Sequence, residues 1–137
     1  MSHVGEVSPT DAWNALTHDP RAVLVDVRTR AEWSYVGIPD LTQTGKDLVL
    51  IEWQTYPDGT VNPHFTDQLA AAGIEHDQPV YFLCRSGARS RWAAEAAIRA
   101  GWDEAYNVVE GFEGPPDAAR HRVVSGWKTA GLPWVQG

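Results

Sequence analysis

The sequence predicts an α/β fold in which a mostly parallel central sheet is flanked by helices. Short apolar runs rich in β-branched residues alternate along the chain with segments rich in helix formers, the pattern of strand–helix–strand units. The run at residues 22–27, Ala-Val-Leu-Val-Asp-Val, is almost continuously apolar, as expected for a strand covered on both faces. Together these features predict an α/β fold built around one mostly parallel sheet.

The first half of the chain contains three predicted strands and two predicted helices. We expect strands at residues 4–7, 22–27 and 48–53, and helices from Pro9 to about Leu16 and from about Arg30 to Tyr35. Ser8 is suited to cap the first helix and Pro9 fits its first position. Residues 56–59, Tyr-Pro-Asp-Gly, have the composition of a turn.

The second half continues the alternation. Asn62 and Pro63 are expected to open a helix that Gly73 closes. Further elements are a strand at 79–83 that ends directly at Cys84, a helix at 89–99, a strand at 105–109 and a C-terminal helix at 117–129. The helix at 89–99 is rich in good helix formers and is followed by Gly101.

Length and composition predict one domain spanning residues 1–137. The chain is 43% hydrophobic and 21% charged, which is typical of a globular protein. It contains no run of eighteen apolar residues, so we expect no membrane span. The first residues lack the basic and apolar regions of a signal peptide, which leads us to expect a cytoplasmic protein.

Charge and cysteine content exclude several classes of function. Eleven Lys and Arg against eighteen Asp and Glu give a net charge of -7, which argues against nucleic-acid binding. Arg85, Arg89 and Arg91 nevertheless cluster, either as a local anion site or as a solvated helix end. With one cysteine and five scattered histidines, we expect no disulfide, no metal site and no cofactor.

Cys84 is the candidate nucleophile because it lies at the carboxyl end of a predicted strand, just before a helix. Ligands of such sheets bind at this edge. Backbone N–H groups and the helix dipole favour a thiolate there, Arg85 and Arg89 add charge, and Gly87 permits the tight curvature. The alternative is that Cys84 is simply a small buried apolar residue at a strand end.

Three blocks of the sequence resemble the rhodanese family. Residues 84–90, Cys-Arg-Ser-Gly-Ala-Arg-Ser, are similar to its active-site loop, Cys-Arg-x-Gly-x-Arg-Ser. Residues 24–28 with Glu32-Trp33 and Gly37-Ile38-Pro39 resemble its first signature, although the usual His before Ile38 is absent. Residues 107–114 lie where the family has a strand leading into a Gly-Gly turn. The resemblance covers about residues 5–115 and leaves a C-terminal helix and tail at 116–137.

The resemblance implies a single-domain thiosulfate sulfurtransferase with a rhodanese-like three-layer fold. Cys84 would take sulfane sulfur from a small anionic donor such as thiosulfate, then pass it from a persulfide to cyanide, a low-molecular-weight thiol or a thioredoxin-like protein. The donor-binding residues implied by the family loop are Arg85, Ser86, Gly87, Ala88, Arg89 and Ser90. Arg85 and Arg89 would hold the anionic donor and stabilise the departing sulfite.

Asp26 and Arg28 follow the buried strand and carry charges that need partners. They could form a structural ion pair with each other, and Glu32 is another candidate partner. The family pattern places both in a supporting role beneath the active loop. We assign neither of them direct chemistry.

Two alternative functions stay open. Related cysteine phosphatases use Cys-x5-Arg, whereas four residues separate Cys84 from Arg89, so a phosphatase or arsenate reductase is the less favoured enzyme. A binding or regulatory module on the same scaffold is the other alternative, which the retention of Cys84 and Arg89 disfavours. Trp53 is expected to pack in the core or to recognise a partner, and Trp127 and Trp134 to fold back on the domain or to form a protein interface.

Overall fold

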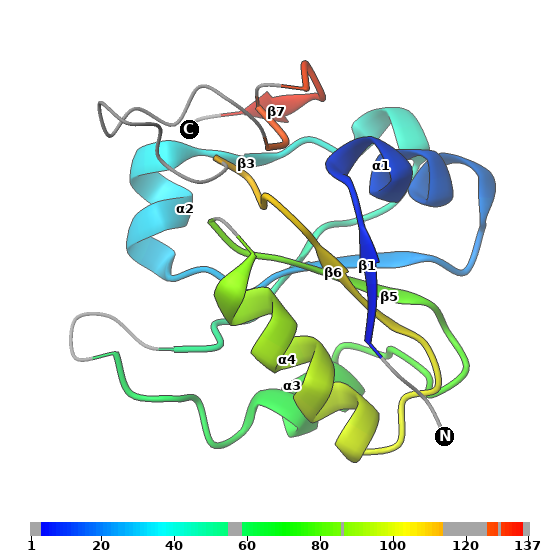
Figure 1. Ribbon diagram of the computed structural model, residues 1–137, viewed down its shortest axis with the longest axis vertical. Helices are drawn as coiled ribbons and strands as arrows, with labels where there is room; N and C mark the ends of the chain where they lie inside the picture. Colours follow the sequence, from blue (N-terminus) through cyan, green and yellow to red (C-terminus); the bar gives the residue numbers. More distant parts are fainter. Residues whose placement is uncertain (1–3, 55–58, 86, 114–125, 129, 136–137) are drawn as a thin grey trace.

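A computed structural model of the chain describes residues 4–54, 59–85, 87–113, 126–128 and 130–135 (Figure 1). A five-stranded sheet in the order β1-β6-β5-β2-β4 forms its centre, and each of its pairings is parallel. The strands are β1 (Val4–Val7), β2 (Val23–Asp26), β4 (Val49–Leu50), β5 (Val80–Leu83) and β6 (Ala105–Val108). The prediction of an α/β fold around a parallel sheet is therefore confirmed.

Helices cover both faces of this sheet (Figure 1). They are α1 (Pro9–His18), α2 (Arg30–Val36), α3 (Phe65–Ala71), α4 (Ala88–Arg99) and the short 3-10 helix η1 (Thr42–Thr44). A separate antiparallel pair joins β3 (Ile38–Pro39) to β7 (Trp134–Val135). The chain thus brings its C-terminal end back beside the segment that follows α2.

Alternation along β5 divides the core into two layers. Val80, Phe82 and then Cys84 face a cluster built with α3 and α4, whereas Tyr81 and Leu83 face a cluster built with α1 and Trp127. All four residues of the strand are buried. A central strand covered on both faces explains why its sequence is continuously apolar.

The first helix follows its predicted start. The Ser8 side chain accepts a hydrogen bond from the Asp11 backbone N–H at 3.1 Å, and Pro9 occupies the first helical position. The helix continues two residues past the expected end at Leu16, as far as His18. Helix ends of this kind are the least predictable part of an element.

The predicted opening of the third helix at Asn62-Pro63 is wrong. The Asn62 side chain accepts from the His64 backbone N–H at 3.0 Å and donates to the Glu52 carbonyl oxygen at 2.9 Å. These bonds fold residues 62–64 into a turn held against the preceding segment, and α3 begins at Phe65. Asn side chains commonly compete with helix formation in this way.

The predicted strand at 48–53 is shorter than expected. Val49–Leu50 pairs with β2, and the backbone N–H groups of Ile51 and Trp53 still donate to Asp26 and Val27 at 3.2 and 3.1 Å. Gln54 then forms an antiparallel bridge with Val61. The predicted turn at 56–59 and C-terminal helix at 117–129 lie almost wholly outside the described residues.

The tryptophans outside the family blocks have different environments. Trp53 packs edge-on against Phe65 at 5.2 Å, on the core beneath α3. Trp127 is fully buried, lies edge-on to Trp13 at 5.9 Å and donates its indole N–H to the Pro133 carbonyl at 2.8 Å. Trp134 lies on β7 and stays 38% exposed, so only one of the two late tryptophans is buried.

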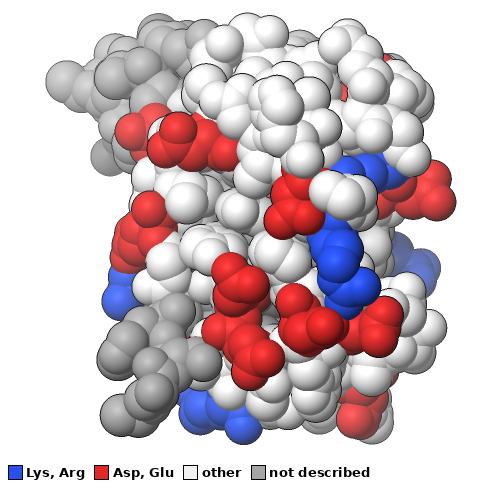
Figure 2. Space-filling view, turned by 90° about the vertical axis from the view of Figure 1, so that its right-hand side faces the viewer, with Lys and Arg blue, Asp and Glu red and all other residues white. Residues whose placement is uncertain are grey.

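In the described part of the chain, no helix is long and apolar enough to cross a membrane, and no group of acidic, His or Cys side chains could hold a metal ion. On the face in Figure 2, basic side chains lie among acidic ones and form no continuous basic patch.

Candidate active site

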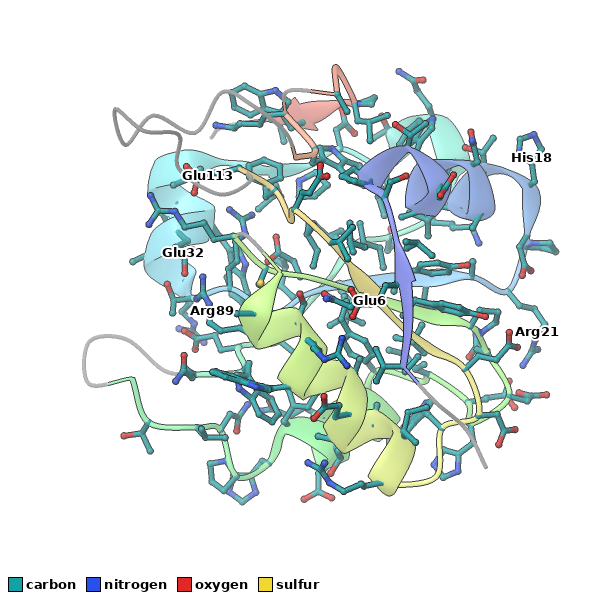
Figure 3. All side chains as sticks on the ribbon, viewed as in Figure 1. Glu6, His18, Arg21, Glu32, Arg89 and Glu113 are labelled. Carbon is teal, nitrogen blue, oxygen red and sulfur yellow. The ribbon has the colours of Figure 1, made fainter. Side chains whose placement is uncertain are left out.

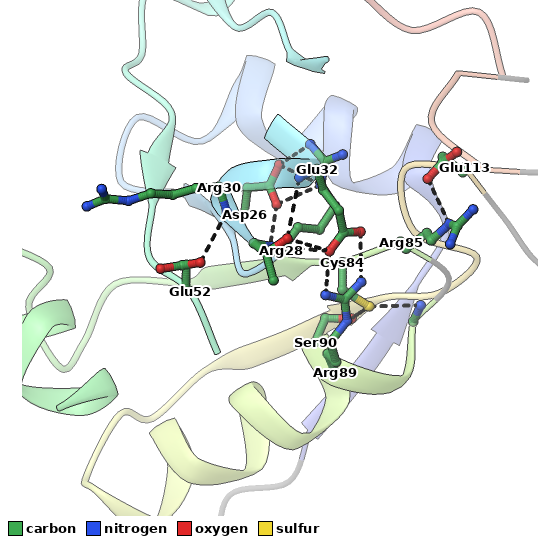
Figure 4. A network of polar contacts seen from close by, with 12 residues as sticks. Asp26, Arg28, Arg30, Glu32, Glu52, Cys84, Arg85, Arg89, Ser90 and Glu113 are labelled. Atoms are coloured by element: carbon green, nitrogen blue, oxygen red, sulfur yellow. Dashed lines mark hydrogen bonds and ion pairs between the residues drawn. The ribbon is translucent and has the colours of Figure 1, made fainter. Parts of the chain in front are cut away.

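The end of β5 places Cys84 between the ends of its two neighbouring strands (Figure 4). The Val27 N–H donates to the Leu83 carbonyl at 2.8 Å, so the register with β2 continues to the residue before the cysteine. Cys84 is 1% exposed. Cys84 thus directly follows the paired part of β5, and its side chain is buried.

Gly87 directs a backbone donor at the sulfur. Its φ of 109° is in the left-handed region that favours glycine, and it precedes the first residue of α4, Ala88. The turn brings the Gly87 N–H to 3.0 Å from Cys84 Sγ. This contact places a backbone N–H donor at the start of α4 directly against the cysteine sulfur.

Ser90 supplies a second contact to the sulfur. Its hydroxyl is buried 3.2 Å from Cys84 Sγ and 2.5 Å from Asn107 Oδ1 on β6. A hydroxyl has one proton, so Ser90 donates to one of these two acceptors at a time. With a thiol present, Ser90 can donate to Asn107 and accept from the S–H; with a thiolate, it can donate to sulfur instead.

The segment after β6 fixes the other side of the loop. Phe112 and Glu113 donate their N–H groups to the carbonyl oxygens of Cys84 and Arg85 at 2.8 and 3.0 Å. Gly111, with φ of 59°, permits this close approach, because a Cβ there would lie 2.5 Å from the Cys84 carbonyl oxygen. The Gly-rich block of the sequence therefore acts as a backbone clamp on the active loop.

A buried ion pair lies at the end of β2. Arg28 Nη2 is 2.6 Å from Asp26 Oδ2, Arg28 Nε donates to Asp26 Oδ1 at 2.9 Å, and both side chains are completely buried. Arg28 also donates to the Gly37 carbonyl at 2.8 Å and lies over the Phe112 ring at 4.3 Å. The expected pairing of Asp26 with Arg28 is present. Through its contacts with Gly37 and Phe112, Arg28 also connects the end of α2 to the segment after β6.

Arg89 is bound by a carboxylate from outside its loop. Its two terminal nitrogens donate to the two oxygens of Glu32 at 2.6 and 2.9 Å, with both side chains about one-fifth exposed. Glu32 also accepts from the Thr29 backbone N–H as the capping box of α2. The helix cap thereby fixes the carboxylate that receives Arg89.

The Glu32–Arg89 ion pair shifts the pKa of both groups. Burial by itself would raise the pKa of the Glu32 carboxyl, but the hydrogen bonds and charge of Arg89 and the Thr29 N–H outweigh it and hold that pKa below its ordinary 4.5. The hydrogen bond to Glu32 raises the pKa of the Arg89 guanidinium. Both groups are therefore charged at neutral pH.

Arg85 also has a carboxylate partner. Its Nε lies 2.9 Å from Glu113 Oε2, an ion pair without the alignment of a hydrogen bond. The Arg85 side chain is 46% exposed, whereas that of Glu113 is 16% exposed. Nearby Lys128 lies over the Trp134 ring at 3.8 Å. Ser86 lies outside the described residues, so its predicted role stays a prediction.

Cys84 and Gly87 lie in the connection between β5 and α4, and Ala88, Arg89 and Ser90 form the first turn of α4. The structure adds partners for these residues that the sequence does not reveal. From the sequence we expect no separate role for Asn107, Gly111 or Glu113, and we expect Glu32 to pair with Asp26 or Arg28; in the structure Glu32 pairs with Arg89. Among these partners, only Glu32 carries a signal that can be read locally in the sequence, the capping motif Thr29-x-x-Glu32. The other contacts join segments distant in sequence.

Comparison with protein families matches residues 4–137 to the family described as the STR4 middle domain. An uncharacterized protein of Rickettsia conorii is 37% identical over 96% of this chain and 97% of its own. Rhodanese-like domain-containing protein 4 of Arabidopsis thaliana is 29% identical over 96% of this chain and 26% of its own. Thiosulfate sulfurtransferase GlpE of Actinobacillus pleuropneumoniae is 25% identical over 93% of this chain and 90% of its own.

Solved structures share this architecture. The crystal structure of Rv0390 from M. tuberculosis has a TM-score of 0.90 and 50% identity, covering 99% of this chain and 100% of that one. The rhodanese-like domain of the Anabaena Alr3790 protein has a TM-score of 0.60 and 16% identity, covering 100% of this chain and 81% of that one. The second likeness concerns the fold alone.

Proposed function

This chain belongs to the rhodanese-like family of the STR4 middle domain, and we propose that it is a sulfurtransferase that carries sulfane sulfur as a persulfide on Cys84. The observation that carries the proposal is the pair of contacts at Cys84 Sγ, from the Gly87 N–H at 3.0 Å and the Ser90 hydroxyl at 3.2 Å. The family supplies the reaction class, since one relative is named a thiosulfate sulfurtransferase.

In the first step, the Cys84 thiolate attacks the outer sulfur of a donor. A new S–S bond forms to Cys84 while the donor's own S–S bond breaks, and the leaving group keeps the electron pair. The Gly87 N–H and the Ser90 hydroxyl are positioned to stabilise charge on sulfur during this exchange. A thiophilic acceptor then removes the outer sulfur and restores the thiolate.

The acceptor that we propose is a low-molecular-weight thiol or a thioredoxin-like protein, because Cys84 has no second cysteine in the chain to resolve its persulfide. The proposed compartment is the cytoplasm. A lone thiol fits a reducing compartment, where cysteines are kept unpaired.

Two other functions compete with this proposal. A phosphatase or arsenate reductase would need a loop that surrounds a tetrahedral oxyanion. The loop from Cys84 to Arg89 is short, and its Gly87 N–H donates directly to Cys84 Sγ. A binding module would not need two donors converging on a buried sulfur. Both observations favour sulfur transfer.

Intact-protein mass spectrometry tests the proposal. After incubation with thiosulfate or with an organic persulfide, the wild-type protein should gain one sulfur atom, and a thiol or cyanide should remove it. The Cys84→Ser variant is the matched control and should gain nothing. If neither donor adds mass to the wild type, the chain is not a sulfurtransferase, and phosphatase, arsenate and partner-binding assays take priority.

A further inference from the structure

Asn107 is a polar residue at an apolar position of the core. On β6, Ala105 faces the cluster built with α3 and α4, whereas Val108 faces the cluster built with α1. Side chains alternate along a strand, so Asn107 lies on the α4 side, where it is 3% exposed. A buried amide is costly unless it is hydrogen-bonded, so the partner of this side chain decides what it contributes.

That partner is Ser90, which also contacts the candidate nucleophile. The Ser90 hydroxyl donates to Asn107 Oδ1 at 2.5 Å and lies 3.2 Å from Cys84 Sγ. Ser90 is completely buried, so its hydroxyl is shielded from bulk water. The hydroxyl has one proton and two acceptors within reach, and Asn107 therefore competes with the sulfur for it.

The charge on the sulfur decides this competition. Cys84 Sγ is uncharged in the thiol and as the inner sulfur of a persulfide, and uncharged sulfur is a weak acceptor, so the hydroxyl donates to the amide oxygen. As a thiolate, Sγ is a charged acceptor, and hydrogen bonds to charged acceptors are roughly twice as strong as neutral ones. The hydroxyl then turns to the sulfur, and Asn107 Oδ1 gives up its bond.

The charged side chains around the active loop form ion pairs with one another. They come from the end of β2, from α2 and α4, and from the segments after β5 and β6, and they are Asp26, Arg28, Glu32, Arg85, Arg89 and Glu113 (Figure 4). Replacing the Ser90 hydroxyl or the Asn107 amide leaves these three pairs in place. Variants at the two positions therefore report on the hydroxyl proton and not on a changed set of charges.

We infer that Asn107 is a positioning residue that holds the Ser90 proton away from Cys84 Sγ while the sulfur is uncharged and releases it as charge develops there. The inference rests on the proposed function. When an acceptor thiolate R–S⁻ attacks the outer sulfur of Cys84–S–SH, an R–S bond forms, and the bond between the two persulfide sulfurs breaks with its electron pair on Sγ. The products are R–S–SH and the Cys84 thiolate, and the outer sulfur keeps its proton. Because Asn107 draws the hydroxyl away from the leaving sulfur, it slows this step and helps the protein retain its persulfide.

Asn107→Leu tests the inference because leucine has a similar volume and no hydrogen-bond acceptor. The Ser90 hydroxyl is then left with Cys84 Sγ as its partner before the sulfur departs. Asn107→Val is a second apolar variant, whose β-branched side chain suits a strand if leucine disturbs the packing. Asn14→Leu, on the exposed side of α1, is the matched control.

The measurement is the rate at which dithiothreitol removes the outer sulfur from persulfidated protein, followed by intact mass. Asn107→Leu and Asn107→Val should release sulfur about three- to tenfold faster than the wild type, the size of one hydrogen bond. Ser90→Ala should release it more slowly by about the same factor, because the departing thiolate loses a donor. The double variant should match Ser90→Ala, since Asn107 acts only through the hydroxyl, and Asn14→Leu should match the wild type.

A mixed disulfide makes the test independent of sulfur transfer. Methyl methanethiosulfonate converts Cys84 to Cys84–S–S–CH₃, and attack of dithiothreitol on the methyl-bearing sulfur releases the same Cys84 thiolate. The variants should release Cys84 in the same order of rates. If the wild type accepts no sulfur from any donor while the mixed disulfides keep this order, the proposed function fails and the role of Asn107 stands.

Two results would overturn the inference. One is a release rate in the apolar Asn107 variants that equals the wild-type rate or falls below it. The other is an acceleration that persists when residue 90 is already alanine, because it would show a packing effect independent of the hydroxyl.

Discussion

The two ends of strand β2 each carry an arginine–aspartate pair, and the pairs differ mainly in their surroundings. Before the strand, Arg21 Nη2 lies 2.5 Å from Asp77, with the side chains 48% and 70% exposed. After it, Arg28 Nη2 lies 2.6 Å from Asp26, with both side chains completely buried. Figure 3 shows Arg21 on the opposite side of the molecule from Glu32 and Arg89.

Equal distances therefore do not mean equal contributions to stability. At the exposed end, water competes with the ion pair, and the neighbouring Lys46 ammonium donates to the carbonyl oxygens of Asp19 and Ala22 beside a hollow of about 240 Å³. At the buried end, removing one partner leaves a charge that water cannot reach. The end of the sheet that carries Cys84 is the one where single side chains matter most.

The largest effect expected from this comparison is that of Asp26→Asn. It leaves the Arg28 charge buried without a counter-charge and should lower the free energy of unfolding by about 3–5 kcal/mol. Asp77→Asn, the same change at the exposed end, should cost less than about 1 kcal/mol. Urea denaturation of both variants gives the two values, and equal losses would contradict the contrast.

The next contrast compares two glycines with positive φ, Gly111 beside Cys84 and Gly73 beside the hollow near Arg21. Gly111→Ala combines a left-handed φ of 59° with a Cβ 2.5 Å from the Cys84 carbonyl oxygen, and should cost about 2–4 kcal/mol and slow sulfur loading. Gly73→Ala has a φ of 83° and open space around its Cβ, so it should cost about 1–2 kcal/mol. Denaturation together with loading rates separates them; normal loading in Gly111→Ala would show that the clamp does not position Cys84.

Removal of the Ser90 hydroxyl should have a smaller effect, on chemistry at Cys84 and on the buried hydrogen bond to Asn107 Oδ1. Ser90→Ala deletes a donor to Cys84 Sγ and should slow sulfur loading about tenfold. Ser8→Ala, the matched serine change at the cap of α1, should cost about 1 kcal/mol of stability and leave loading unchanged. Loading reactions stopped at successive times and analysed by intact mass give the rate of sulfur loading for each variant. Equal rates for Ser90→Ala and wild type would show that Ser90 takes no part in the transfer step.

The smallest effect concerns pH and the Glu32–Arg89 pair. The pKa of Glu32 is lowered on folding, so its stabilisation is complete above the ordinary value of 4.5 and is lost as pH falls through the lowered one. Glu32→Gln should therefore cost about 1 kcal/mol at neutral pH and progressively less in acid. Denaturation midpoints of the two proteins between pH 7 and pH 3 check this; a constant difference would mean that charge is not what the pair contributes.

Local signals in the sequence predicted most of the elements. The strand at 4–7, the cap and proline of α1 and the continuously apolar β5 follow from capping chemistry and hydrophobic pattern, which act within a few residues. The helix expected after Asn62 is present as α3, but its predicted start was wrong because the Asn62 side chain bonds the Glu52 carbonyl, a contact outside its own segment. β4 is shorter than predicted, although the Ile51 and Trp53 backbone N–H groups still bond Asp26 and Val27 beyond its end.

The sequence by itself determined the α/β alternation, the family resemblance of the loop and the position of Cys84 at the end of a buried strand, because these depend on neighbouring residues. Only the tertiary structure decided which charges meet. Arg89 and Glu32 are 57 residues apart in sequence, and Ser90 and Asn107 are 17 apart. Parallel pairing of β2, β5 and β6 brings their carboxyl ends to one edge, and that arrangement neutralises the arginines the sequence left free to bind a donor.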